Sequence, residues 1–245
     1  MTTAVPPRPP AARSRPRRWA AAVARYVRAA PGSCLWLVIL GLNTFAMVRM
    51  SPRMRRYFLF THSTNLDQLR HHPIKVLITS AFWTETPSFF FWFLVFNLFL
   101  VPLERWLGTR RWLLVVVAAH VGATLVSEGV VNVLINTGAL PERDAYALDI
   151  GVSYAVAGAV GMLTWFLARP LRWYYLGAAT CFFVLLLISS WDFTNLGHIT
   201  AFLIGVGCYP VGRGVPGGDR RPRWPLRGGG RDREKAVTTA QGATG

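Results

Sequence analysis

Long uncharged stretches alternate with short charged ones along most of this chain. Six apolar segments approach the roughly 20 residues that a helix needs to cross the hydrocarbon core of a bilayer. We therefore expect an all-α polytopic membrane protein, built as a bundle of six transmembrane helices. The expected spans are residues 31–48, 87–103, 112–126, 150–168, 173–190 and 193–211.

The longest connection between spans is residues 49–86, which is rich in arginine. Its middle part, PIKVLITSAFW at 73–83, is apolar but too short to cross a bilayer. Irregular backbone at membrane depth has to be buried against protein, so we expect a first loop that is partly embedded in the membrane surface.

The two ends of the chain differ from this apolar core. Residues 1–30 hold no acidic residue and predict a basic, largely disordered tail with a short interfacial helix from residue 19. Residues 213–245 predict a second basic, disordered tail, which leaves 31–212 as the membrane domain. A cleavable signal peptide is the competing interpretation of the first apolar segment, but this segment is longer than a signal core and lacks a clear cleavage site.

The net charge of +16 changes the picture less than its size suggests, because 7 of the 27 basic residues precede Pro31 and 8 follow Pro210. Basic tails beside membrane helices are explained by cytoplasmic retention and by anionic lipid headgroups, and we expect no nucleic-acid partner. We predict a multi-pass protein of the plasma membrane with both termini cytoplasmic. The basic connection 49–86 disagrees with this orientation, and the two tails outweigh it.

The composition, 52% hydrophobic and 16% charged, is too apolar and too uneven for one soluble domain. All three cysteines lie inside apolar runs, where cysteine acts as a small hydrophobic residue. We expect no disulfide, no metal site and no cofactor.

Two polar side chains stand out inside the last apolar segments. Ser153 lies four residues after Asp149, and His198 lies six residues after Asp192. At about 1.5 Å per helical residue, these offsets place both side chains at nearly the same depth if the two spans enter from the same side. A serine nucleophile and a histidine base could then meet. The ordinary alternative is a serine that serves helix packing or bonds to its own backbone.

Small residues recur on the same helical faces as Ser153 and His198, and they predict close helix packing. Such faces let two backbones approach and bring side chains at matched depth within hydrogen-bonding range. The small residues are Ala157 and Gly161 on the serine span, and Gly197, Ala201 and Gly205 on the histidine span.

Three further ionisable residues have ordinary explanations. Asp149 and Asp192 can each cap or charge-stabilise the start of the span that follows, and we assign neither a catalytic role. His120 lies in the middle of the third span, where a helix–helix hydrogen bond and a functional role are equally supported.

Together these features resemble the rhomboid family of intramembrane serine proteases over about residues 31–212, and in particular its divergent actinobacterial members. Gly151, Val152 and Ser153 are similar to the family's Gly-x-Ser motif, and Gly197 with His198 is similar to its Gly/Ala-His motif. LITSAF at 77–82 resembles a pattern of the family's embedded first loop. Asn97 followed by Glu104, Arg105 and Gly108 resembles the end of its second span.

The resemblance implies a Ser153–His198 dyad, with Asn97 and backbone N–H groups near Gly151 and Ser153 binding the oxyanion. Three positions depart from the pattern of active members. Phe93 replaces a histidine that helps to bind the oxyanion, Tyr154 replaces a glycine, and Ala157 replaces an aromatic residue that stacks on the histidine. Loss of one oxyanion donor costs roughly 10²- to 10³-fold in rate, so these changes weaken a protease without excluding one.

Three function classes remain open. The first is proteolysis of transmembrane substrates, and the second is a catalytically weak or inactive protein that binds transmembrane clients. The third is a path for a small solute or ion, which predicts more ionisable residues deep in the spans than this chain has.

Overall fold

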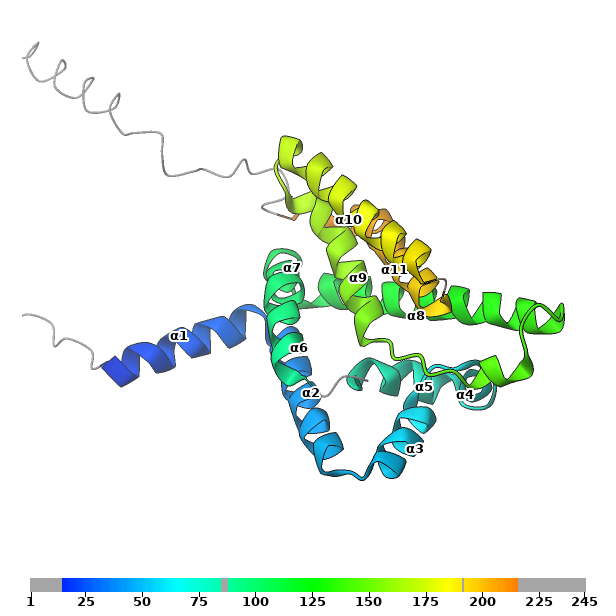
Figure 1. The fold of residues 1–245 in the computed structure, drawn as a ribbon. Coiled ribbons are helices and arrows are strands. Elements are labelled where there is room, and N and C mark those ends of the chain that lie inside the picture. The colour runs from blue at the N-terminus through cyan, green and yellow to red at the C-terminus, as the bar shows by residue number, and fades with distance from the viewer. Residues whose placement is uncertain (1–14, 85–87, 191, 216–245) are drawn as a thin grey trace, which may run out of the picture.

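The computed structural model describes residues 15–84, 88–190 and 192–215, and every regular element in these ranges is a helix (Figure 1). The elements are α1 (Arg15–Ala29), α2 (Pro31–Arg49), α3 (Pro52–His62), α4 (Leu66–His71), α5 (Pro73–Thr79), η1 (Ser80–Phe82), α6 (Phe89–Val95), η2 (Phe96–Leu100), α7 (Val101–Leu107), α8 (Thr109–Asn136), η3 (Glu142–Tyr146), α9 (Val152–Leu163), η4 (Thr164–Phe166), α10 (Arg169–Ser189), α11 (Phe193–Gly207) and α12 (Tyr209–Gly212).

Four helices are long and apolar enough to cross a membrane: Pro31–Arg49, Phe89–Leu107, Thr109–Asn136 and Arg169–Ser189. Helices of this length and composition are typical of membrane proteins. The fourth and sixth expected spans correspond to shorter apolar helices, Val152–Phe166 and Phe193–Gly207. The expectation of six spans is therefore supported by length at four positions and stays a prediction at the other two.

The third span is longer than the sequence predicts. Residues 112–126 were expected because Glu128 looked like the start of a loop, but α8 continues to Asn136. The Glu128 side chain is buried, 2% exposed, and therefore lies inside the protein and not in a solvated connection. The residues after it, VVNVLI, are apolar enough to extend the helix.

Other helix ends also shift. The second span is one continuous helix that runs to Leu107 and contains a π-helical turn at Phe96–Leu100. The fifth begins at Arg169, because Pro170 occupies a first-turn position where its missing N–H costs nothing. The sixth ends at Gly207 and is followed by the short α12.

Residues 85–87 and both terminal tails, 1–14 and 216–245, lie outside the described residues. In the N-terminal region, α1 begins at Arg15, four residues before the helix expected from the sequence, and its interfacial position stays a prediction.

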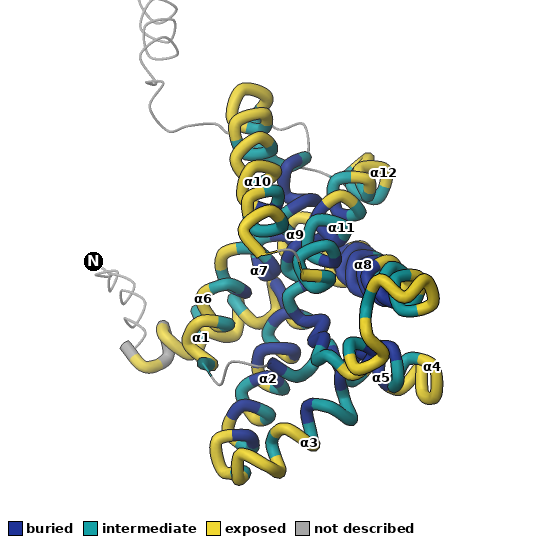
Figure 2. Tube along the Cα trace, turned by 45° about the vertical axis from the view of Figure 1, so that its right-hand side comes forward, coloured by how far each residue is buried: buried dark blue, intermediate teal, exposed yellow. Residues whose placement is uncertain are grey.

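Helix α9 lies at the centre of the molecule. It packs against α8 and α11, and most of its residues are buried, whereas α10 is largely exposed along its outer side (Figure 2). Its sequence explains this position: within VSYAVAGAVGML only Ser153 and Tyr154 carry polar side-chain atoms. A helix that is apolar on every face is suited to the core of a bundle.

One end of the bundle gathers segments that are far apart in sequence. Glu104, 1% exposed, accepts hydrogen bonds from the backbone N–H groups of Gly32 (2.8 Å) and Ser33 (2.7 Å) at the start of α2. Arg111 at the start of α8 donates to the carbonyl oxygen of Arg213 (3.3 Å). The start of α2 and the end of α12 therefore lie at the same end of the bundle.

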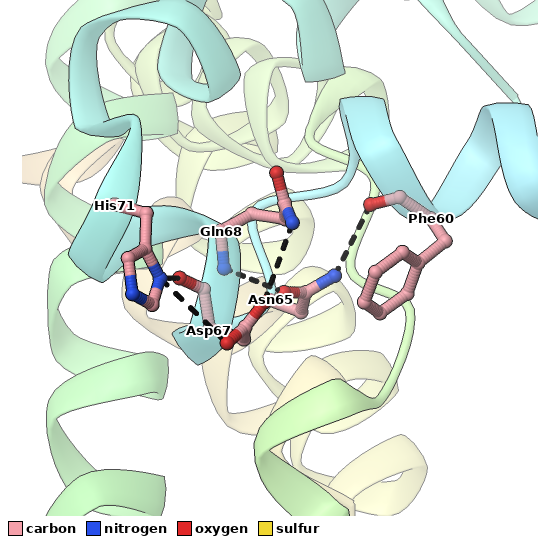
Figure 3. A network of polar contacts seen from close by, with 5 residues as sticks. All are labelled: Phe60, Asn65, Asp67, Gln68 and His71. Atoms are coloured by element: carbon pink, nitrogen blue, oxygen red, sulfur yellow. Dashed lines mark hydrogen bonds and ion pairs between the residues drawn. The ribbon is translucent and has the colours of Figure 1, made fainter.

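At the opposite end, α3, α4 and α5 form a compact corner. Asn65 caps α4 by accepting from the N–H of Gln68 (2.9 Å) and donates through Nδ2 to the carbonyl oxygen of Phe60 (3.3 Å), as Figure 3 shows. His71 bonds to the carbonyl oxygen of Asp67 (2.8 Å). The expected long first loop is thus a set of short helices that these polar contacts hold together.

The LITSAF segment is tied to α2. Trp36 donates through its indole N–H to the carbonyl oxygen of Ala81 (2.9 Å), and Asn43 donates to that of Phe82 (2.7 Å). These bonds satisfy carbonyl groups at the end of α5 and η1, where backbone would otherwise be buried unpaired.

Candidate functional site

Helices α9 and α11 run parallel and in register. A Cβ built on Gly197 would lie 2.6 Å from Cε1 of Tyr154, one built on Gly205 would lie 2.9 Å from Cα of Gly158, and one built on Gly161 would lie 2.8 Å from the nitrogen of Val206. In each pair the residue numbers differ by 43 to 47 and rise together along both helices. Ser153 and His198 consequently lie at nearly the same level, as their offsets predict.

The small-residue faces differ in part from the expected ones. Gly161, Gly197, Ala201 and Gly205 lie at the interface of α9 and α11. Ala157 belongs to one buried cluster with Ala201 and Phe202 of α11, and it also lines a cavity beside Ser153. Gly158, which the sequence analysis did not single out, lies at the interface as well. The sequence contains a clue to this contact, because Gly158 and Gly161 are spaced i, i+3 and so lie on one side of the helix.

Ser153 and His198 line the same cavity, of about 470 Å³, which is bounded by α6–η2, α9, α10 and α11. Its walls are otherwise almost wholly apolar. The remaining lining residues are Phe91, Trp92, Val95, Phe99, Val156, Ala157, Val160, Tyr175, Ala178, Ala179, Phe182, Phe183 and Leu186. The Tyr175 hydroxyl is engaged, since it donates to the carbonyl oxygen of Val160 (3.0 Å).

The two polar side chains are not yet engaged with each other. Ser153 Oγ donates to the carbonyl oxygen of Ile150 (3.4 Å), one turn back. His198 Nδ1 is buried and makes no hydrogen bond within the described part of the chain. The hydrogen bonds among the described residues therefore include none between Ser153 and His198.

Tyr154 is fully buried behind His198. The two rings meet edge to face, with centroids 5.2 Å apart and planes at 74°. Gly197 leaves the room that the tyrosine ring occupies. The Tyr154 ring packs into the interface of α9 and α11, and its hydroxyl has Asp149, Ser127 and Glu128 as neighbours.

Asn97 is not brought to this cavity, which corrects the expected oxyanion role. Its Oδ1 accepts from the Tyr26 hydroxyl of α1, and its Nδ2 donates to the carbonyl oxygen of Phe93 (2.7 Å). The cavity is lined by the other face of this helix, through residues such as Val95 and Phe99. Phe93 is 46% exposed, so a histidine there is not expected to supply an oxyanion donor.

Gly151 has no side chain and so allows the His120 ring to lie close to its backbone. A Cβ on Gly151 would overlap the imidazole ring of His120, whose Nε2 would lie only 3.0 Å away. That same Nε2 is bonded to the carbonyl oxygen of Leu77 (2.8 Å) and lies 3.4 Å from Ser80 Oγ. His120 therefore links the embedded loop to the segment that leads into Ser153, which supports its structural interpretation.

Asp149 does not cap α9, contrary to the sequence prediction. The helix begins at Val152, and Asp149 instead pairs with the end of α3. Its N–H donates to Ser63 Oγ (2.7 Å), while its carbonyl oxygen accepts from the N–H of Thr64 (2.9 Å). Asp192 does cap α11, because its carboxylate accepts from the N–H of Thr194 (3.3 Å).

A family model described as rhomboid-like protein matches residues 25–218. The chain belongs to this rhomboid-like family. Comparisons with curated proteins and with solved structures found no match.

The matched range covers every described helix except the first part of α1. Membership of the rhomboid-like family and the apolar helices agree on a membrane protein. In this member, the residues brought to the cavity are Ser153 and His198, with Tyr154 behind the histidine and Gly151 before the serine.

Proposed function

We propose that this protein is an intramembrane serine protease that cleaves transmembrane substrates with a Ser153–His198 dyad. The observation that carries the proposal is the shared cavity: the serine and the histidine face it from two parallel helices at one depth. The proposal includes six spans, with α9 and α11 crossing as short helices inside the bundle, and both termini cytoplasmic in the plasma membrane.

The cavity suits an apolar polypeptide. Phenylalanine, valine, alanine and leucine side chains from α6–η2 and α10 form most of its wall, and α10 is the least buried of the long helices. A transmembrane segment could replace lipid along this wall at little cost, because both are apolar. Its peptide group would then lie beside the polar side chains of Ser153 and His198.

The chemistry follows from these two groups. Ser153 Oγ attacks the carbonyl carbon of the substrate's peptide bond, and His198 takes the hydroxyl proton and returns it to the leaving amine. Water then hydrolyses the acyl ester by the reverse proton transfers. Since Asn97 lies elsewhere, oxyanion binding falls to backbone N–H groups at the start of α9, which have no partners inside the helix.

Tyr154 acts in this proposal as a positioning residue. Its ring packs edge to face against the His198 imidazole. In this proposal it takes the role of the stacking aromatic residue that active members carry where this chain has Ala157. Tyr154→Phe should keep the ring contact and most of the activity, whereas Tyr154→Leu should lose both.

The position of Asn97 favours a second candidate, a rhomboid-like protein that binds transmembrane clients in the same cavity without cleaving them. The two are separated by reconstituting the protein in liposomes with a single-span substrate. The protease proposal expects cleavage that disappears in Ser153→Ala and in His198→Ala. Binding of the substrate with no cleavage by the wild type would favour the second candidate.

A further inference from the structure

Four arginines gather at the corner where α2 ends and α3 begins. Arg49, Arg53, Arg55 and Arg56 fall within eight residues, and α3 contains no acidic side chain. None of the four forms an ion pair with any described residue, since the two ion pairs found there involve His71 and Arg143. This corner thus concentrates positive charge that the described protein does not neutralise.

Two of the four arginines line a shallow, open hollow of about 550 Å³ along α3. It is lined by Pro52, Arg53, Arg56, Tyr57 and Phe60, so two guanidinium groups and two aromatic rings share one side of α3. Residues 53, 56, 57 and 60 are spaced i, i+3, i+4 and i+7, which places them on one helical face. The hollow therefore pairs a site for an anion with an apolar wall.

If α2 crosses the bilayer, this corner lies at the membrane boundary. Helix α2 is one of the candidate spans and ends at Arg49, only three residues before α3 begins. Tyr57 and Met54 are 66% and 54% exposed, which suits the interface between headgroups and acyl chains and not bulk water. An exposed helix with arginine, tyrosine and methionine beside a span has the composition of an interfacial helix.

Both ends of α3 are fixed. Ser51 caps its start by accepting from the N–H of Met54 (3.3 Å), and Pro52 occupies the first turn. At its other end the carbonyl oxygen of Phe60 accepts from Asn65, within the network of Figure 3. The residues of the hollow are therefore held on a short helix that is capped at its start and bonded to Asn65 at its end.

We propose that Arg53 and Arg56 bind the phosphate of an anionic glycerophospholipid, with Tyr57 and Phe60 against its glycerol and upper acyl chains. Arginine binds phosphate oxygens through its planar fork of N–H donors. Four uncompensated positive charges favour a lipid with net negative charge over a zwitterionic one. This site is separate from the terminal tails and does not depend on the proposed protease activity.

The test uses the full chain purified in a neutral detergent. Binding is measured by native mass spectrometry, and the thermal unfolding midpoint by tryptophan fluorescence, while phosphatidylglycerol, phosphatidylcholine or glycerol phosphate is added. We expect phosphatidylglycerol to bind about tenfold more tightly than phosphatidylcholine and to raise the midpoint. Glycerol phosphate, which lacks acyl chains, should do neither; if it matches the lipid, the site is one for free phosphate and the proposal is wrong.

Matched variants locate the site. The double variant Arg53→Gln with Arg56→Gln should abolish the preference for phosphatidylglycerol. The double variant Arg53→Lys with Arg56→Lys keeps the charge and should weaken this preference. It also tests the site if the glutamine variant does not fold. Arg105→Gln with Arg110→Gln makes the same charge change at exposed positions at the other end of the bundle and should keep the preference. Three results would overturn the proposal. They are an equal loss of lipid preference in this control, an unchanged preference in both Arg53/Arg56 double variants, and equal binding of the two lipids by the wild type.

Discussion

The carbonyl oxygen of Phe202 occupies the space into which a side chain on Gly161 would project. Backbone, and not a movable side chain, fills this space, so neither helix can yield without separating α9 from α11. The contact fixes the parallel register that sets Ser153 and His198 at one level.

We therefore predict that Gly161→Ala destabilises the protein by roughly 1–3 kcal/mol, the usual cost of overpacking. The matched control is Gly177→Ala on α10, where a Cβ has nothing within 4 Å and an alanine should be neutral or slightly stabilising. Thermal unfolding in detergent measures both. Equal midpoints for the two variants would show that α9 and α11 are not in close contact at Gly161.

The contact between Gly151 and His120 gives a prediction about coupling. Gly151→Ala should be destabilising because its methyl group overlaps the imidazole, and His120→Ala should lose the bond to the carbonyl oxygen of Leu77. In the double variant the overlap is gone, so its cost should fall below the sum of the two single costs by about 1 kcal/mol. Thermal unfolding of the wild type and the three variants completes this double-mutant cycle. If the costs of the two single changes simply add, Gly151 and His120 are not in contact.

Ser63 gives a third prediction, about the segment that precedes the serine. Its hydroxyl accepts from the N–H of Asp149 and donates to the carbonyl oxygen of the same residue (3.0 Å). Ser63→Ala removes this acceptor from the buried N–H of Asp149, whereas the carbonyl oxygen keeps its bond from the N–H of Thr64 (2.9 Å), and the change should cost about 1–3 kcal/mol. It should also speed amide hydrogen exchange in residues 147–152.

The control for Ser63 is Ser189→Ala, an exposed serine whose hydroxyl bonds only to its own helix at Leu186. This change should stay within about 0.5 kcal/mol of the wild type. If exchange in 147–152 is unchanged in Ser63→Ala, then Asp149 is held by other contacts.

The sequence was sufficient for the placement of the helices and for the level of the two polar side chains. Apolar length locates each helix, and the distances from Asp149 to Ser153 and from Asp192 to His198 carry over because both helices begin near those residues and run parallel. The family resemblance over 31–212 agrees with the matched range 25–218.

The errors arose where tertiary contacts decide the outcome. Glu128 looked like a loop residue because a charge normally ends a span, but its side chain is buried within α8, next to Asp149 and Tyr154. Asn97 lies in a π-helical turn, where residues no longer follow the usual spacing of faces, and its partner Tyr26 comes from a helix outside the bundle core. Neither effect is readable from local sequence.

The central claim, that Ser153 is a nucleophile activated by His198, is tested most directly by labelling the purified protein with a fluorophosphonate probe and identifying the modified residue by mass spectrometry. We predict that the wild type is labelled at Ser153, that Ser153→Ala is not labelled, and that His198→Ala is labelled at least about a hundredfold more slowly. A folded wild-type protein that takes up no probe at Ser153, or one whose labelling is unaffected by His198→Ala, would contradict it.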